Sequence, residues 1–338
     1  MRQIVTTANG NIDVLKIEEV PDLKPGAGDV LVRVKAAGLN FADILARQGL
    51  YPDAPKKPCV MGYEVAGTVE GVGAGVDETL IGKSVVAMTR FRGQAELVVV
   101  KARQIFEKPE SLSFEQAAAL PVNYLTAYAL LAVMGSLQPG ESVLIHNAGG
   151  GVGLAAIDIA KRLSATTYGT ASPGKHEVLR KRGLDHAIDY RTKDWLDELN
   201  KLTNKRGVEL VIDPIGGGHW RKSYQALRAT GRLGMFGIST ASADGLKGKL
   251  GMVKAAWQTP WFHPFGLLNK NKGVFGLNLG HMWHEPEKVA EWMKVLLDGV
   301  SEGWVRPHVD RSFQFTEAGA AHQYLEQRKN IGKVVLVP

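Results

Sequence analysis

Three polar residues interrupt the otherwise apolar stretch "AAGLNFADILARQGLYP", residues 36–52. They are the amide of Asn40, the carboxylate of Asp43 and the phenol of Tyr51. An amide and a phenol can donate hydrogen bonds to a carbonyl oxygen, and a carboxylate accepts them from nearby N–H groups. Because burying such groups without partners costs free energy, they either stabilise the local fold or face a ligand. The stretch alone leaves both interpretations open.

A glycine-rich loop in "VLIHNAGGGVG", residues 143–153, carries the strongest chemical signal. Ala148, Gly150 and Gly153 occupy the three small-residue positions of a dinucleotide fingerprint, and Gly151 and Val152 lie where a helix should begin. Small residues allow a tight turn and close approach to a pyrophosphate, and a helix N-terminus offers N–H groups to the phosphates. A strand-like run precedes the loop and a helical run follows it, so we predict a dinucleotide site rather than a structural turn.

The next strand-like run and its turn, "YGTASPGKHE", indicate which dinucleotide binds. NAD sites usually place an acidic residue about 20 residues beyond the first glycine. Here the first acidic residue after the strand is Glu177, beyond the turn. Ser172 and Lys175 occupy the region instead, and a hydroxyl and a cation suit a 2′-phosphate. We therefore predict NADPH, with a solvated Lys175 as the alternative interpretation.

The elements that must position these residues change character near residue 113. Residues 1–112 contain short β-branched runs separated by Gly, Pro or Asp, which is typical of a barrel or sandwich. A helical period then begins, with Ser113 as a candidate N-cap and Pro121 dividing the helix. Strands and helices alternate afterwards, which predicts a parallel doubly wound sheet. The tail again combines a helix and a strand, so we expect the α/β unit to be inserted into the first domain.

Composition limits the class of protein. The chain has 338 residues, enough for two domains, with 45% hydrophobic and 22% charged residues, as in an ordinary globular protein. The net charge of +7 is spread among acidic residues, and no nucleic-acid-binding motif is present, so we do not expect a nucleic-acid partner. We find no signal-peptide pattern and no apolar run of about 18 residues, and we expect a cytoplasmic protein.

Several stretches together carry a family resemblance: "GYEVAGTV", "LPVNYLTAY", "LQPGESVLIHNAGGGVG" and "NIGKVVLVP". The chain resembles the medium-chain dehydrogenase/reductase superfamily. Within it the chain is most similar to the zinc-independent quinone oxidoreductase branch, and closest to the group named for the synaptic vesicle membrane protein homologue. The resemblance implies an α/β fold in which a Rossmann-type doubly wound parallel sheet is inserted in a GroES-like β-barrel catalytic domain. The implied boundaries are 1–122 with 284–338 for the catalytic domain and 123–283 for the NADP-binding domain.

The resemblance also implies which residues form the site, in two groups. The group in the cleft beside the nicotinamide comprises Asn40, Asp43, Tyr51 and Thr126. The group that reaches the 2′-phosphate, the ribose and the rest of the cofactor comprises Lys175, Tyr190 and Asn330.

The resemblance bears on metal binding as well. Zinc-dependent relatives have a ligand Cys at the position of Asn40 and a ligand His at the position of Tyr63. Amide and phenol groups are poor zinc ligands, and the single Cys59 cannot form a four-cysteine structural site. We therefore expect no zinc.

These implications lead to a hypothesis for the reaction. The chain is expected to reduce small apolar quinones or α,β-unsaturated carbonyl compounds with NADPH. Tyr51 is the first candidate to donate a hydrogen bond to the substrate oxygen and Asn40 the second, while Asp43 orients the loop. Two alternatives stay open: an NADPH-binding membrane-associated or sensing protein with little turnover, and a 2-enoyl-thioester reductase.

Two further expectations concern partners. Aromatic and basic residues concentrate in segment 247–265, which could pack at an interface, line the substrate site or make weak peripheral contact with a membrane. The run "GVFGLNLG" is expected to form an edge strand, which relatives pair across a two-fold axis, so we expect a homodimer.

Overall fold

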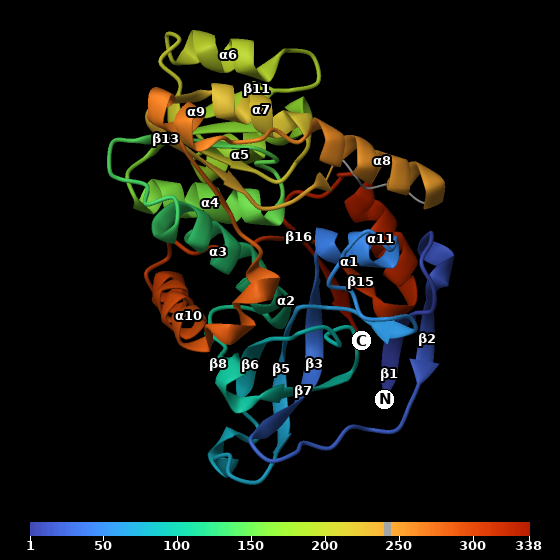
Figure 1. The fold of residues 1–338 in the computed structure, drawn as a ribbon. Coiled ribbons are helices and arrows are strands. Elements are labelled where there is room, and N and C mark those ends of the chain that lie inside the picture. The colour runs from blue at the N-terminus through green and yellow to red at the C-terminus, as the bar shows by residue number, and fades with distance from the viewer. Residues whose placement is uncertain (240–244) are drawn as a thin grey trace.

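The computed structural model describes residues 1–239 and 245–338, with the backbone but not the side chains of 245–249. The chain forms a β-rich lobe and an α/β lobe, and both marked ends of the chain lie in the β-rich lobe (Figure 1). This arrangement agrees with the expected insertion of the α/β unit between two parts of the other domain.

The β-rich lobe holds two sheets. The seven-stranded sheet contains, in spatial order, β15 (Val309–Gln314), β16 (Lys333–Val337), β3 (Asp29–Leu39), β5 (Glu64–Val72), β6 (Ser84–Met88) and β8 (Ile105–Glu107), with β7 (Leu97–Lys101) paired to β3. The three-stranded sheet contains β2 (Leu15–Glu19), β1 (Arg2–Thr6) and β4 (Cys59–Val60). Since β16 runs antiparallel to β3, with Val334 opposite Leu39, the tail of the chain completes the sheet that the first hundred residues begin.

The α/β lobe is built on a six-stranded parallel sheet. Its order is β11 (His186–Asp189), β10 (Thr166–Ala171), β9 (Ser142–Ile145), β12 (Val208–Asp213), β13 (Leu227–Met235) and β14 (Gly273–Gly276). Alternate residues of β9 enter different cores: Val143 and Ile145 pack on one face and Leu144 on the other. A strand that is apolar on both faces needs helices on both sides, which is the doubly wound arrangement that the sequence predicts.

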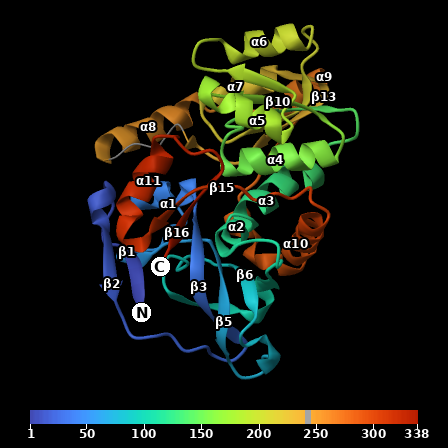
Figure 2. The same ribbon diagram turned by 180° about the vertical axis from the view of Figure 1, so that it is seen from behind.

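Helices cover both faces of this sheet. One face packs against α3 (Pro121–Tyr128), α4 (Gly151–Arg162), α5 (His176–Arg182) and α10 (Pro286–Ser301), and the other against α6 (Trp195–Leu202) and α7 (Gly218–Gln225). The long α8 (Gly245–Gln258) projects from the side of this lobe in both views (Figure 2) and is followed by α9 (Pro264–Lys270). Because α10 shares the core of α3 and α4, the domain boundaries at 122 and 284 stay a prediction.

The remaining helices confirm some local signals and reveal one that was missed. Ser113 caps α2 (Phe114–Ala118), and Pro121 begins α3, as predicted. The apolar stretch at 36–52 contains a short helix, α1 (Phe41–Arg47), for which Asn40 is the N-cap. The helix α11 (Ala318–Glu326) packs on the seven-stranded sheet. Among the described residues no helix is both long and apolar enough to cross a bilayer.

Candidate active site

The glycine loop joins the carboxyl end of β9 to the N-terminus of α4. Gly150 is the N-cap of the helix, and Gly151 and Val152 begin it. A Cβ on Gly153 would lie 2.5 Å from the Ala148 carbonyl oxygen, so only glycine allows the helix to approach the loop this closely. A Cβ on Gly151 would lie 2.5 Å from the Asn123 side chain. The loop is thus a backbone cradle at a helix N-terminus, which fits the pyrophosphate of a dinucleotide.

The C-terminal segment closes over this cradle. Gly332 donates its N–H to the Gly149 carbonyl (2.9 Å), and the Asn330 side chain, which is buried, donates to the Gly332 carbonyl (2.7 Å). The Lys175 ammonium donates to the carbonyls of Arg328 (2.9 Å) and Asn330 (2.5 Å). Lys175 and Asn330, which lie far apart in the sequence, are therefore neighbours, as a shared cofactor site requires.

The residues predicted to contact the adenosine side of the cofactor lie at the carboxyl ends of the parallel strands. Ser172 directly follows β10 and Tyr190 directly follows β11, and these parallel strands end opposite each other. Burial lowers the pKa of Lys175, and the charges of Arg191 and Arg328 lower it further. The charge of Asp310 acts in the opposite direction. The two arginines, which sequence reasoning missed, add positive charge near Lys175, and positive charge favours a phosphate.

A buried polar corner forms around Asn40. The Asn40 side chain accepts a hydrogen bond from the Lys333 ammonium (2.7 Å) and donates one to a Glu64 carboxylate oxygen (3.0 Å). Lys333 and Glu64 also form an ion pair with almost no exposure to solvent. The second Glu64 oxygen accepts the backbone N–H of Val122 (2.7 Å) at the start of α3. The corner thereby connects α1, β5, β16 and α3.

Asp43 fixes the backbone next to this corner. Its carboxylate accepts the N–H groups of Asn40 (2.8 Å) and Gly62 (3.1 Å), which ties the start of α1 to the residues before β5. These bonds are compatible with an orienting role for Asp43, which stays a prediction. Burial raises the pKa of Asp43 to about 7, although both backbone hydrogen bonds act in the opposite direction.

Two tyrosine rings lie beyond Asp43. The rings of Tyr51 and Tyr63 meet edge to face, with centroids 6.3 Å apart. Tyr51 is half-buried, and a Cβ on Gly280 would lie 3.3 Å from its hydroxyl. Burial raises the pKa of Tyr51, and the charge of Asp53 adds to this. Tyr51 thus lies where the loop after α1 meets the loop after β14.

The remaining nicotinamide-side candidate, Thr126, is buried on α3. The neighbouring Tyr124 hydroxyl donates to buried Asp158 of α4 (2.6 Å), which also pairs with Arg182 and Arg306. This network holds α3 against the helix that follows the glycine loop, so Thr126 is carried on a firmly positioned element.

A second group of ionisable side chains lies at the carboxyl ends of β9 and β12. Asp213 accepts hydrogen bonds from His219 Nδ1 (2.6 Å) and the Ser223 hydroxyl (2.6 Å). Both nitrogens of buried His146 have partners, Thr170 at 3.0 Å and Ser223 at 3.2 Å. Burial lowers the pKa of His146 to about 3, which keeps the ring neutral. Although His146, Asp213 and His219 are metal-ligand types, this network satisfies its polar atoms as it stands, and we interpret it as the attachment of α7 to the sheet.

Glu64 and Lys333 are the principal residues that sequence reasoning missed. Both are charged residues at the start of an otherwise apolar strand, in "EVAGTV" and "KVVLV". A buried charge needs a partner, so this isolated placement was the available signal.

Comparisons with known proteins agree with this architecture. The family described as "Alcohol dehydrogenase GroES-like domain" matches residues 26–110, and "Zinc-binding dehydrogenase" matches residues 182–336. The chain is 40% identical to the synaptic vesicle membrane protein VAT-1 homolog of Rattus norvegicus over 341 aligned residues, covering all of this chain and 84% of that protein.

Solved structures of related proteins superpose on this chain over nearly its full length. The quinone oxidoreductase of Escherichia coli complexed with NADPH superposes with a TM-score of 0.88 at 30% identity, over the full length of both chains. The CurK enoyl reductase superposes with a TM-score of 0.85 at 29% identity, over 99% of this chain and 98% of that one.

Proposed function

The chain belongs to the medium-chain dehydrogenase/reductase superfamily of oxidoreductases, and on this premise we propose that it is a zinc-independent, NADPH-dependent reductase of quinones or α,β-unsaturated carbonyl compounds. One observation carries the proposal. Gly332 bonds to the glycine loop while the next residue, Lys333, bonds to Asn40. Two consecutive residues thus link the glycine loop to the polar corner, which supports the proposal that cofactor and substrate bind next to each other.

The donor set supports the zinc-independent part of the proposal. The amide nitrogen and oxygen of Asn40 are both occupied by Glu64 and Lys333, and an amide is a poor zinc ligand compared with a thiolate. The ammonium of Lys333 would also repel a cation placed at this corner.

The residues at hand fit the roles that reduction requires. NADPH, when bound, supplies the hydride. The cradle at Gly150–Gly153 holds the pyrophosphate, and Lys175 with Arg191 favours the additional phosphate of NADPH. A carbonyl oxygen that gains negative charge needs a fixed hydrogen-bond donor in a site shielded from water. Tyr51 fits this role better than Asn40, because the Asn40 amide already donates to Glu64.

The decisive experiment measures NADPH oxidation against quinones, enones, 2-enals and a 2-enoyl thioester, with bound metal determined in the same preparation. We expect turnover with quinones or enones and no stoichiometric zinc. Reduction of the thioester alone would favour the enoyl-reductase alternative, given the similarity to CurK. NADPH binding without turnover of any compound would contradict the proposal and favour a sensing role.

A specific surface favours membrane association as a second function. We call Leu250, Val253, Trp257, Trp261, Phe265 and Leu268 the aromatic surface. Trp257 is 85% exposed and Trp261 is 99% exposed, values that a folded chain rarely tolerates without a partner.

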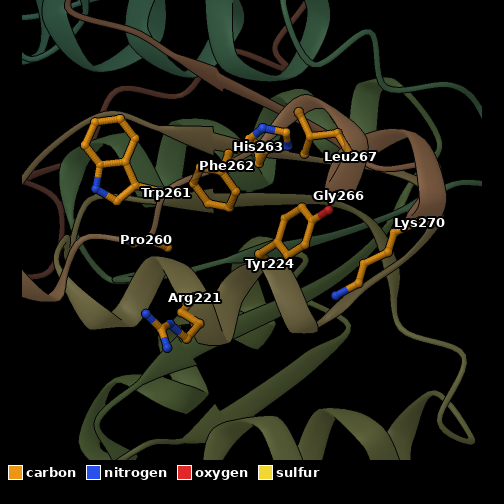
Figure 3. Close-up of a pocket in the computed structure, with 9 residues that line it drawn as sticks. All are labelled: Arg221, Tyr224, Pro260, Trp261, Phe262, His263, Gly266, Leu267 and Lys270. Atoms are coloured by element: carbon orange, nitrogen blue, oxygen red, sulfur yellow. The ribbon is translucent and has the colours of Figure 1, made fainter.

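A pocket of about 260 Å³ lies beside the aromatic surface, and in it Arg221 and Lys270 flank Tyr224 (Figure 3). Exposed tryptophans next to cations suit the interface of an anionic bilayer. The Lys247 and Lys249 side chains, part of the predicted segment, lie outside the described residues.

Vesicle sedimentation tests this second function. Trp257→Ala/Trp261→Ala/Phe265→Ala should abolish sedimentation with vesicles containing phosphatidylserine. The matched control Ile81→Ala/Val133→Ala/Leu202→Ala removes exposed apolar side chains elsewhere and should sediment like wild type. Equal sedimentation of both variants would refute membrane contact. If, without vesicles, the triple aromatic variant has a lower molar mass in solution than wild type, the surface would instead be a contact between copies of the chain.

A further inference from the structure

The Tyr63 side chain carries a buried hydroxyl without a hydrogen-bond partner among the described residues. The residue is only 8% exposed. The Tyr51 hydroxyl interacts with the Tyr63 hydroxyl and influences its pKa, but at a geometry looser than that of an ordinary hydrogen bond. Burying a hydroxyl without a full hydrogen bond destabilises the folded chain, and a ligand oxygen that accepts its proton would remove this cost.

The surroundings determine which ligand atom fits. Burial raises the pKa of Tyr63, and the nearby charge of Asp43 raises it further, so the phenol keeps its proton and serves as a donor. A neutral carbonyl oxygen accepts such a bond, whereas a carboxylate would be repelled by the charge of Asp53.

The walls around the hydroxyl are aromatic. Phe91 packs against Tyr63 with ring centroids 5.2 Å apart, and Tyr51 closes another side. Phe91 and Arg92 both adopt left-handed backbone conformations, with φ of 68° and 66°. Non-glycine residues adopt this conformation uncommonly, and it accompanies the contact of the Phe91 ring with Tyr63. Tyr51 and Phe91 are both half-buried, so each is partly accessible from solvent.

From this geometry we propose that Tyr63 is the hydroxyl that binds the carbonyl oxygen of the substrate, with Tyr51 as a second hydroxyl facing the same oxygen. The inference rests on the proposed reductase function and refines it, because it transfers the first donor role from Tyr51 to Tyr63. The substrate class it selects is a planar conjugated carbonyl compound whose apolar body lies between aromatic rings.

The test uses the full chain saturated with NADP⁺, which permits binding without reduction, and cinnamaldehyde as the probe. A hydrogen bond lowers the carbonyl stretching frequency, which Raman difference spectroscopy reports directly. We expect a lowered frequency in wild type, a return towards the value in apolar solvent in Tyr63→Phe, and a partial return in Tyr51→Phe. Tyr168→Phe is the matched control, because its ring stacks on His186 in the α/β sheet, and it should behave as wild type.

Kinetics and stability separate a substrate role from a structural one. With NADPH, kcat/KM of Tyr63→Phe for cinnamaldehyde should fall about tenfold or more. Its Tm should equal or exceed that of wild type, because the substitution removes an unpartnered hydroxyl. An unchanged stretching frequency, kcat/KM within about twofold of wild type, or a lowered Tm would each overturn the assignment of Tyr63 while leaving the reductase function intact. Failure of wild type to reduce any carbonyl compound would overturn both.

Discussion

At the scale of single residues, the buried pair of Lys333 and Glu64 dominates the energetics of the site. Both groups have lost their hydration, so each depends on the other and on Asn40 for compensation. Removing one member of such a pair leaves an isolated charge in the protein interior, which is far more costly than losing a surface ion pair.

Lys333→Met should therefore lower the free energy of unfolding by about 3–5 kcal/mol, measured by urea denaturation. Lys101→Ala, which removes an exposed ion pair with Asp29, is the control and should cost less than about 1 kcal/mol. The double variant Lys333→Met/Glu64→Gln should recover part of the loss. Equal effects of Lys333→Met and Lys101→Ala would show that the pair is unimportant for stability.

The raised pKa of Asp43 predicts that the free energy of unfolding depends on pH. Its pKa rises from 3.8 in the unfolded chain to about 7 in the folded one, so the folded state binds the proton more tightly. The resulting stabilisation is complete below the unfolded pKa and is lost as the pH rises through about 7. Relative to Asp43→Asn, which does not titrate, wild type should lose stability between about pH 4 and pH 7, with a slope of at most about 1.4 kcal/mol per pH unit. A constant difference across this range would show that Asp43 remains ionised.

Lys175 should decide the preference between the two nicotinamide cofactors. Lys175→Ala removes a cation near Ser172 and Tyr190. Only NADPH carries the 2′-phosphate that this cation would bind, so only NADPH should lose an interaction. We expect Kd for NADPH to rise roughly tenfold and Kd for NADH to change little, measured by fluorescence titration. Equal losses for both cofactors would place Lys175 outside the phosphate site.

At the scale of elements, the glycine loop depends on close contact between α4 and the end of β9. Gly153→Ala places a methyl group against backbone carbonyls that cannot move aside, so α4 must shift. Kd for NADPH should rise roughly tenfold, or about 1.4 kcal/mol. Gly71→Ala is the control, since Gly71 lies in β5 of the other lobe and a Cβ there meets nothing within 4 Å, and its affinity should match wild type.

Elements defined by local signals were predictable from the sequence, whereas those defined by distant partners were not. Ser113 and Pro121 determine where α2 and α3 begin through chemistry within one turn, and Gly153 does the same for the loop before α4. The helix α1 was missed because its apolar composition masked Asn40, whose N–H bonds to Asp43 three residues on. The partnership of Glu64 and Lys333 could not be inferred from the sequence, because it joins strands 269 residues apart.

At the scale of the whole molecule, the strand β14 lies at one edge of the six-stranded sheet. Its outer backbone groups have no neighbouring strand in the described part of the chain, and a second copy could supply one. We expect a homodimer, measurable as twice the chain mass by light scattering. A monomer at micromolar concentration would contradict this.

The connection between Asn40 and Lys333 also has a consequence for the order of folding. The two residues are separated by 293 positions, so their contact closes one of the longest loops available to the chain. Contacts of such high sequence separation form slowly, whereas the glycine loop and its helix can form from neighbouring residues. We therefore expect the glycine loop and its helix to form early in folding and the contacts around Asn40 to form last. Catalytic activity should then appear only after the rest of the chain has folded.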